Sequence, residues 1–214
     1  MSSDDKTKTR DLERTRTNIL KAGRNEFAKY GLEGARVDRI AKKSGSNKSM
    51  IYYIFGGKED LYLATLESLW EEKSELLDGP LFEGKLTIDD APELIAGVLD
   101  NFMKNQEAVR LVLYDVVSGA KFLRKLRKTR PELFATFKLA TGMVDQLGDA
   151  GMIRKIDSEK AIFMLSMVIA MLPIIRQHVD IFAEKDSDAY QSLSDIDGWK
   201  TFLADVIRRI MLDE

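Results

Sequence analysis

The chain has 214 residues, 44% of them hydrophobic and 32% charged, a composition that supports a buried core and excludes wholesale disorder. Cysteine is absent and His178 is the only histidine, which excludes disulfides, cysteine nucleophiles, thiolate zinc sites and multi-histidine metal sites. The net charge of −2 conceals an asymmetry, because residues 1–60 carry 14 Lys/Arg and 9 Asp/Glu whereas residues 61–214 carry 19 and 26. A basic N-terminal quarter on an acidic body suits a nucleic-acid-binding domain followed by a domain with another task.

The N-terminal segment and the longest apolar run bear on where in the cell the protein is expected. Residues 1–9 are mostly Ser, Thr, Lys and Asp, lack the apolar core of a secretory signal, and predict a disordered tail. The apolar run Ala161–Ile175 has fifteen residues, fewer than the roughly 17–25 that a membrane span needs. We therefore expect a cytoplasmic protein without a membrane partner.

Apolar residues recur at helical spacing along most of the chain, and no convincing alternating strand pattern occurs, which predicts an all-α fold of about nine helices. Gly31 and Gly56-Gly57 separate the early helices. Residues 79–88 and 184–198 are predicted to be loops, and Asp90 and Asp157 or Ser158 to be N-caps. The predicted helices are 10–30, 37–43, 47–55, 58 to about 78, about 91–103, 109–117, 131–147, about 158–175 and 199–211.

Residues 37–55, VDRIAKKSGSNKSMIYYIF, have the spacing of a helix-turn-helix. Ala41 is the small residue at the helix crossing, and Gly45, four residues later, suits the turn. Ile51 and Ile54 face back toward the first helix, and Asn47 can cap the second. By spacing alone, an ordinary three-helix packing unit with a solvated polar face remains an equal alternative.

A longer string of residues favours the helix-turn-helix over the ordinary packing unit. The first helix ends in Phe27-Ala28-Lys29-Tyr30-Gly31, Ile40-Ala41 and Gly45 follow, and Tyr52, Phe55, Lys58, Glu59 and Leu61 complete the pattern. With these motifs, residues 13–70 resemble the N-terminal domain of the TetR (tetracycline repressor-like) family of bacterial transcriptional regulators. The resemblance implies a three-helix helix-turn-helix DNA-binding domain at 10–57 and a larger helical effector-binding and dimerisation domain at 58–214.

The resemblance also implies a set of DNA contacts. Base or nearby backbone contacts are expected from the recognition helix, and phosphate contacts from its C-terminal half and from the start of the next helix, where backbone N–H groups would help to hold a phosphate. Asp38 departs from the family pattern, because a basic or polar DNA-facing residue is common there. The expected DNA-binding residues are Arg36, Asn47, Lys48, Ser49, Tyr52, Tyr53 and Lys58.

The rest of the chain is expected to hold a dimer interface and a ligand pocket, as the family usually does. The run Ala161–Ile175 is apolar nearly all round and 199–211 has one apolar face, although both could pack inside a monomer. The expected interface residues are Ile162, Val168, Ile169, Phe202, Val206 and Ile210. The candidate pocket residues, each of which alternatively suits an ordinary core, are Phe102, Met103, Tyr114, Phe134, Phe137, Met143, Phe163, Met164 and Met167.

The basic run KFLRKLRKTR at 121–130 is typical of a solvated face, with contact to DNA or an anionic effector as alternatives.

The leading functional expectation is a homodimeric repressor that binds palindromic operator DNA and releases it on binding a small, mostly apolar effector. A DNA-binding architectural or division-site protein without a sensor is the alternative. An all-helical enzyme is disfavoured because no metal-ligand cluster, phosphate loop or nucleophile elbow occurs, and no cofactor is expected.

Overall fold

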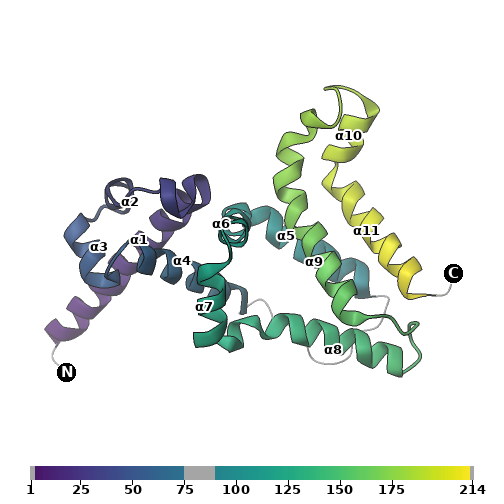
Figure 1. Cartoon of the computed structure of the whole chain (residues 1–214), viewed down its shortest axis with the longest axis horizontal. Helices are drawn as coiled ribbons and strands as arrows, with labels where there is room; N and C mark the ends of the chain where they lie inside the picture. Colours follow the sequence, from purple (N-terminus) through teal and green to yellow (C-terminus); the bar gives the residue numbers. More distant parts are fainter. Residues whose placement is uncertain (1–2, 75–89, 213–214) are drawn as a thin grey trace. The chain divides into compact units, whose positions relative to one another are not determined.

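The computed structural model describes residues 3–74 and 90–212, and every regular element within these ranges is a helix (Figure 1). This confirms the all-α prediction. The first part of the chain contains α1 (Ser3–Gly34), α2 (Val37–Ser44), α3 (Lys48–Phe55) and α4 (Lys58–Ser74). The second part contains α5 (Ala91–Lys104), α6 (Gln106–Val117), α7 (Lys121–Thr129), η4 (Pro131–Phe134), α8 (Ala135–Asp149), α9 (Ser158–Ile175), η5 (Arg176–Ile181), α10 (Asp188–Ser194) and α11 (Ile196–Met211), where η denotes a 3-10 helix.

The expected tail at 1–9 is corrected by the structure, because α1 begins at Ser3. No glycine or proline occurs between Ser3 and Gly23. The packed C-terminal part of α1 supplies the nucleus, and each further residue then adds one hydrogen bond at little cost. An exposed ion pair between Arg14 and Asp11, one turn apart, supports this extension. The predicted end of the fourth helix near residue 78 and the loop 79–88 lie outside the described residues.

Gly31 interrupts α1 as predicted. Its φ of 64° and ψ of −178° lie in a region that is essentially restricted to glycine. A Cβ at this position would meet the ring of Tyr114 at 3.5 Å, an ordinary packing distance, so the backbone conformation rather than space requires the glycine.

The chain forms two compact units, and their division differs from the predicted boundary at 57/58. Unit 1 contains Met1–Lys73 and Glu107–Leu133, and unit 2 contains Ser74–Gln106 and Phe134–Glu214. The helices α4, α6 and α7 therefore belong with the predicted DNA-binding helices. A boundary read along the sequence misses this arrangement, because the chain leaves unit 1 after α4 and returns to it in α6.

Aromatic stacking joins the separate segments of unit 1. Tyr62 on α4 makes edge contacts with Phe27 on α1 at 5.0 Å and with Phe122 on α7 at 4.9 Å between ring centroids. Its hydroxyl donates to the carbonyl of Leu111 on α6 at 3.3 Å. Burial, and secondarily the negative charge of Asp115, raise the pKa of Tyr62. The phenol is thus a neutral hydrogen-bond donor at the centre of this unit.

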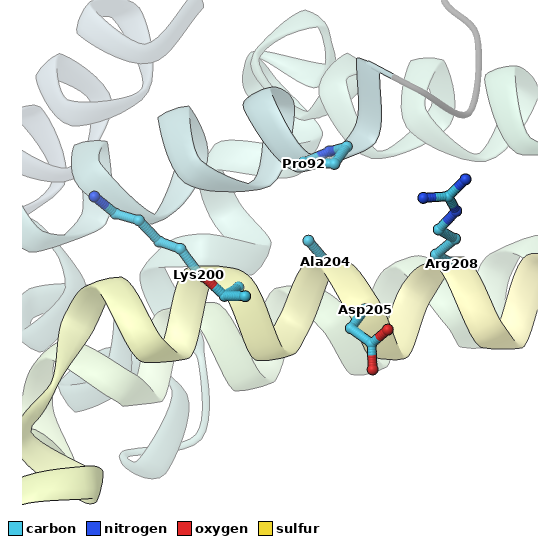
Figure 2. Close-up of a pocket in the computed structure, with 6 residues that line it drawn as sticks. Pro92, Lys200, Ala204, Asp205 and Arg208 are labelled. Carbon is cyan, nitrogen blue, oxygen red and sulfur yellow. The ribbon is translucent and has the colours of Figure 1, made fainter.

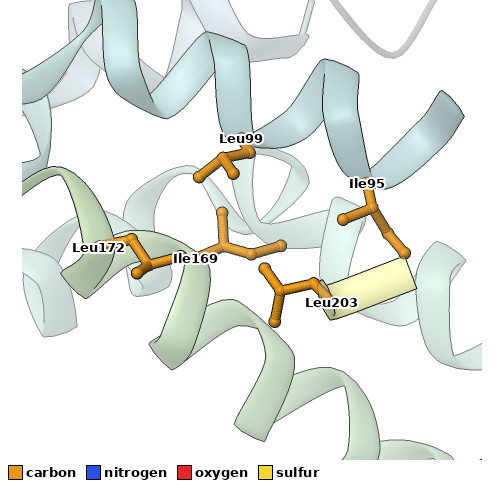
Figure 3. Close-up of a cluster of buried hydrophobic side chains, with 5 residues drawn as sticks. All are labelled: Ile95, Leu99, Ile169, Leu172 and Leu203. Atoms are coloured by element: carbon orange, nitrogen blue, oxygen red, sulfur yellow. The ribbon is translucent and has the colours of Figure 1, made fainter. Parts of the chain in front are cut away.

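The core of unit 2 forms where α5, α9 and α11 meet (Figure 3). Ile95 and Leu99 of α5 pack with Ile169 and Leu172 of α9 and with Leu203 of α11. The segment Ser158–Ile181, α9 with η5, has 24 residues and a mean hydropathy of 1.7. By length and composition it could cross a membrane, so the expectation that this run is too short is wrong. A mostly buried core helix of a soluble protein meets the same criteria, whereas here 22% of the apolar window is buried, with Ile169 and Leu172 packed in the core.

Two loop and helix predictions in unit 2 also need correction. The segment 184–198 contains α10 and the start of α11 rather than a loop. The Ser187 hydroxyl accepts the Tyr190 N–H at 3.1 Å and caps α10, while the indole N–H of Trp199 donates to the Leu193 carbonyl at 3.0 Å. This anchoring offsets the weak apolar periodicity of the segment. The predicted helix 131–147 begins as η4, with α8 following from Ala135.

Candidate nucleic-acid interface

The helix-turn-helix predicted at 37–55 is formed by α2 and α3. Ile40 and Ala41 on α2 and Ile51 on α3 are buried, as the crossing of the two helices requires. Gly45 adopts φ 69° and ψ 18°, and its N–H donates to the Ala41 carbonyl. This left-handed residue ends α2 and turns the chain toward α3. Ile54, also predicted to face inward, is half-buried.

Asn47 caps α3 as predicted, since its side-chain oxygen accepts the Met50 N–H at 2.8 Å. Because one side of α3 packs on the rest of unit 1, the opposite side presents Lys48, Ser49, Tyr52 and Tyr53 to solvent. The two tyrosines are 51% and 78% exposed. Large exposed rings with polar tips beside a cation can contact both base edges and phosphates.

Lys48 forms an ion pair with Asp38, which joins the start of α3 to α2. The hydrogen bond and charge of Asp38 raise the pKa of Lys48, so the amine remains protonated. The departure of Asp38 from the family pattern therefore has a structural consequence. The lysine predicted to contact DNA has an acidic partner within its own protein chain.

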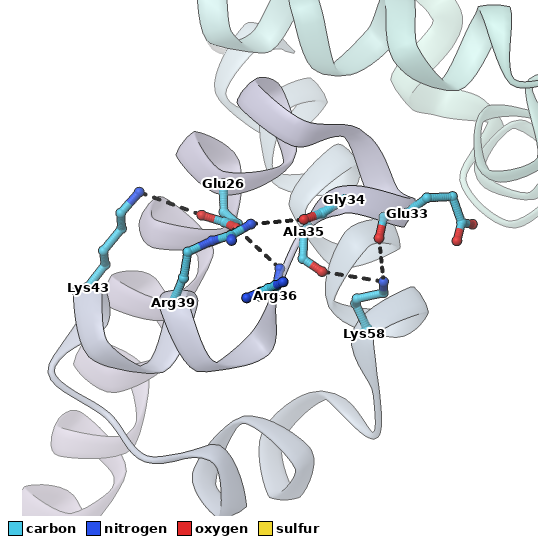
Figure 4. Close-up of polar contacts among 8 residues, drawn as sticks. All are labelled: Glu26, Glu33, Gly34, Ala35, Arg36, Arg39, Lys43 and Lys58. Carbon is cyan, nitrogen blue, oxygen red and sulfur yellow. Dashed lines mark hydrogen bonds and ion pairs between the residues drawn. The ribbon is translucent and has the colours of Figure 1, made fainter.

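A buried carboxylate that sequence reasoning missed fixes α1 against α2 (Figure 4). The Glu26 side chain has no exposed surface, and its Oε1 accepts Arg39 Nε–H at 2.6 Å and the Arg36 backbone N–H at 3.2 Å. Lys43 Nζ lies 3.6 Å from Oε2. Arg39 also donates to the Gly34 carbonyl at 2.8 Å and lies over the Tyr30 ring, 4.3 Å from its centroid.

The sequence contained a signal for this cluster. Glu26 directly precedes Phe27 on the apolar side of α1, where an unpaired carboxylate would be costly. Arg39 and Lys43, one turn apart on α2, provide the compensating cations, and the Arg36 backbone N–H just before the helix adds a third donor. The cluster sets the position of α2, which in turn positions α3.

Lys58 has a structural role at the start of α4. Its ammonium lies 3.4 Å from the carbonyl oxygens of both Glu33 and Ala35 (Figure 4). These bonds hold the first turn of α4 against the connection between α1 and α2. The backbone N–H groups of this turn remain the feature that suits a phosphate.

The nine candidate pocket residues are divided between the two units. Tyr114 belongs to unit 1, whereas the other eight belong to unit 2. Phe102 and Met103 pack against the core of unit 2, while Phe163, Met164 and Met167 are exposed on α9. Figure 2 shows a different pocket of about 370 Å³ that contains none of the nine residues. It is lined by Pro92, Lys200, Thr201, Ala204, Asp205 and Arg208.

The expected dimer residues also divide. Phe202 is 56% exposed and Val168 is exposed, while Ile162, Val206 and Ile210 are half-buried. Ile169 is only 3% exposed because it packs in the core of its own subunit, so its assignment to an interface is wrong.

Within the described ranges, no three His, Asp or Glu side chains form a group that could hold a metal ion.

Comparison with known proteins identifies the helix-turn-helix. Residues 19–65 match the model of the bacterial regulatory proteins of the tetR family. The HTH-type transcriptional repressor NicS of Pseudomonas putida is 27% identical over 213 residues, covering 94% of each chain. The HTH-type transcriptional repressor SCO4008 of Streptomyces coelicolor is 34% identical over 106 residues, covering 50% of this chain and 52% of its own.

By these matches the chain is similar to transcriptional regulators of the tetR family. SCO4942 from Streptomyces coelicolor shares the fold, with a TM-score of 0.67 at 22% identity, covering 92% of this chain and 98% of its own. HlyIIR, a hemolysin II transcriptional regulator, gives a TM-score of 0.62 at 23% identity, covering 86% and 99%. These matches support a DNA-binding transcriptional regulator of this kind.

Proposed function

We propose that the protein is a cytoplasmic homodimeric repressor that binds a palindromic operator and releases it when a small, mostly apolar effector binds unit 2. The exposed face of α3 is the observation that carries DNA recognition. Lys48, Ser49, Tyr52 and Tyr53 project from an eight-residue helix whose start is capped by Asn47 and whose position is fixed by the Gly45 turn. Two such faces related by a dimer axis would read two half-sites about one helical turn apart.

The exposed apolar face of unit 2 supports dimerisation. Phe163, Met164, Met167 and Val168 on α9 are exposed, and so is Phe202 on α11. Clusters of large exposed apolar side chains in a folded protein commonly mark a protein interface. A second copy of the same face would bury them, which accounts for an α9 that is apolar nearly all round.

Unit 2 is compact by itself, and this is the starting point for the proposal that it binds an effector. This unit has its own core, and Phe102 and Met103 of α5 pack against it. The pocket in Figure 2 has a volume typical of small-molecule sites, and Lys200, Asp205 and Arg208 place charged groups along its lining. Phe102 and Met103, which pack against an apolar core, are the residues that we propose for contact with a mostly apolar effector.

An effector can release DNA only through its different affinity for the two states of the repressor. A useful response requires about 1–3 kcal/mol of coupling, and operator DNA must then weaken effector binding by the same factor. Because the coupling is reciprocal, it can be measured as the effect of the effector on DNA affinity or as the effect of DNA on effector affinity.

DNA recognition is tested first, by selecting duplexes from a randomised library with the full-length protein. We expect an inverted repeat to be enriched, and K48A to weaken its binding and relax the base preference. Failure to enrich any sequence would contradict the proposed operator binding. K185A, at an exposed position in unit 2, is the matched control.

Effector sensing is tested by titrating the selected complex with a library of hydrophobic compounds. The expected hit releases DNA and raises the unfolding temperature of the free protein. F102A should then weaken binding of the compound that was found, while R208A, in the pocket of Figure 2, should not. A protein that binds the selected duplex but shows neither response would instead be a DNA binder without a sensor.

A further inference from the structure

The basic run at 121–130 forms an amphipathic helix within unit 1. Phe122 and Leu126 of α7 are buried, and Phe122 contacts the ring of Tyr62. The exposed residues of α7 are Thr129 and five cations, and no acidic residue occurs between Asp115 and Glu132. The cationic face of α7 consists of Lys121, Arg124, Lys125, Arg127 and Lys128.

Two ion pairs place α7 along α4. Lys121 Nζ lies 2.9 Å from Glu59 Oε2 in the first turn of α4, and Arg130 pairs with Glu67 two turns later. Glu59 is the neighbour of Lys58, in the helical turn whose backbone N–H groups suit a DNA phosphate. The cationic face of α7 therefore begins beside the edge of the proposed DNA contact.

Including α6 and α7 in unit 1 sharpens the charge asymmetry of the chain. Unit 1 carries 22 Lys/Arg and 15 Asp/Glu, a net charge of +7, whereas unit 2 carries 11 and 20, a net charge of −9. Lys125 and Lys128 are exposed, and neither side chain makes an ion pair within the described part of the chain. These two ammonium groups are available to an external polyanion.

We propose that the cationic face of α7 binds DNA phosphates beyond those contacted by the helix-turn-helix. The inference rests on the proposed operator binding and extends its contact surface. Lysine ammonium groups on a helix recognise phosphate charge without reading sequence, and each phosphate they neutralise releases condensed counterions. The face therefore adds affinity and salt dependence but no base preference.

The test compares K125Q/K128Q with the parent protein on the selected duplex across a salt series. Glutamine preserves helix propensity at these exposed positions. We expect the slope of log K against log salt to become shallower by about 1–2, and affinity at 0.15 M salt to fall by about fivefold for one lost contact and thirtyfold for two. In a phosphate ethylation interference experiment, K125Q/K128Q should lose phosphate contacts that K48A retains. The base preference of K125Q/K128Q should equal that of the parent protein.

The matched control is K138Q/K185Q, which makes the same charge change at exposed positions of unit 2. An equal effect of both pairs would indicate general charge rather than contact and would overturn the inference, as would an unchanged slope with K125Q/K128Q. Loss of binding to phosphatidylglycerol vesicles with normal DNA binding would assign the face to lipid headgroups instead. If the parent protein does not bind the duplex, the proposed function itself fails.

Discussion

Lys48 shows how a single residue can set the strength of DNA binding. In the free protein its ammonium is held by Asp38, so a DNA contact must compete with an intramolecular ion pair. Asp38 is also an exposed negative charge on α2, beside this lysine at the start of α3. If α3 binds DNA as proposed, an acidic residue at this family position, which is commonly polar or basic, opposes that binding.

We therefore expect D38N to bind the selected duplex a few-fold more tightly than the parent, because it frees Lys48 and removes repulsion from phosphates. Fluorescence anisotropy at two salt concentrations would measure this. D11N removes the same charge from an exposed part of α1 and serves as the control. Unchanged or weaker binding by D38N would show that Lys48 does not contact DNA.

Glu26 acts at the same scale, on stability. E26Q keeps the shape of the side chain but removes the charge that faces Arg39 and Lys43. Charged hydrogen bonds of this kind contribute about 1.5–3 kcal/mol, so the free energy of unfolding should fall by about that amount. Urea titration would measure the loss, with E33Q at an exposed position as the control. A loss equal to that of E33Q would refute the structural role of the buried carboxylate.

At the scale of elements, the connection from α2 to α3 depends on one backbone conformation. A Cβ on Gly45 would meet no atom within 4 Å, so substitution there costs only the positive φ. G45A should lower the free energy of unfolding by about 1–2 kcal/mol, and G45N by less, because asparagine tolerates this conformation better. Equal stability of G45A and the parent, measured by urea unfolding, would mean that the turn relaxes to another conformation.

Each helix boundary in this region follows from local chemistry. Asn47 caps α3 because its short side chain reaches the Met50 N–H, and Gly56, with φ 91°, ends the helix at Phe55. Boundaries that depend on neighbours are different. The helix α10 has little apolar periodicity of its own, and Ser187 and Trp199 hold it in place.

At the scale of the whole molecule, the exposed apolar face of α9 and α11 governs assembly. Replacing Phe202 and Val206 by glutamate should yield monomers, because two like charges per subunit would be buried without partners. Light scattering would give the mass, and circular dichroism would verify that the helices remain. K185E, exposed in unit 2, should stay dimeric. A folded double variant with unchanged dimer mass would place the interface elsewhere.

The sequence by itself determined the all-α class, the helix-turn-helix, the Gly45 turn and the Asn47 cap. These features depend on residues within one or two helical turns of each other, so their physical causes are visible in a linear reading. The resemblance to the tetR family added the exposed residues of α3. Their solvent exposure then followed from the helical phase of Ile51.

Only the tertiary structure decided which helices belong together and which partners the charged residues choose. The chain leaves unit 1 and returns to it, so the membership of α7 depends on packing against Tyr62, far away in sequence. Glu26 and Asp38 likewise find their cations across a helix crossing. Ile169 was misassigned because a helix that is apolar nearly all round carries no phase information, and only its neighbours on α5 and α11 decide which side is buried.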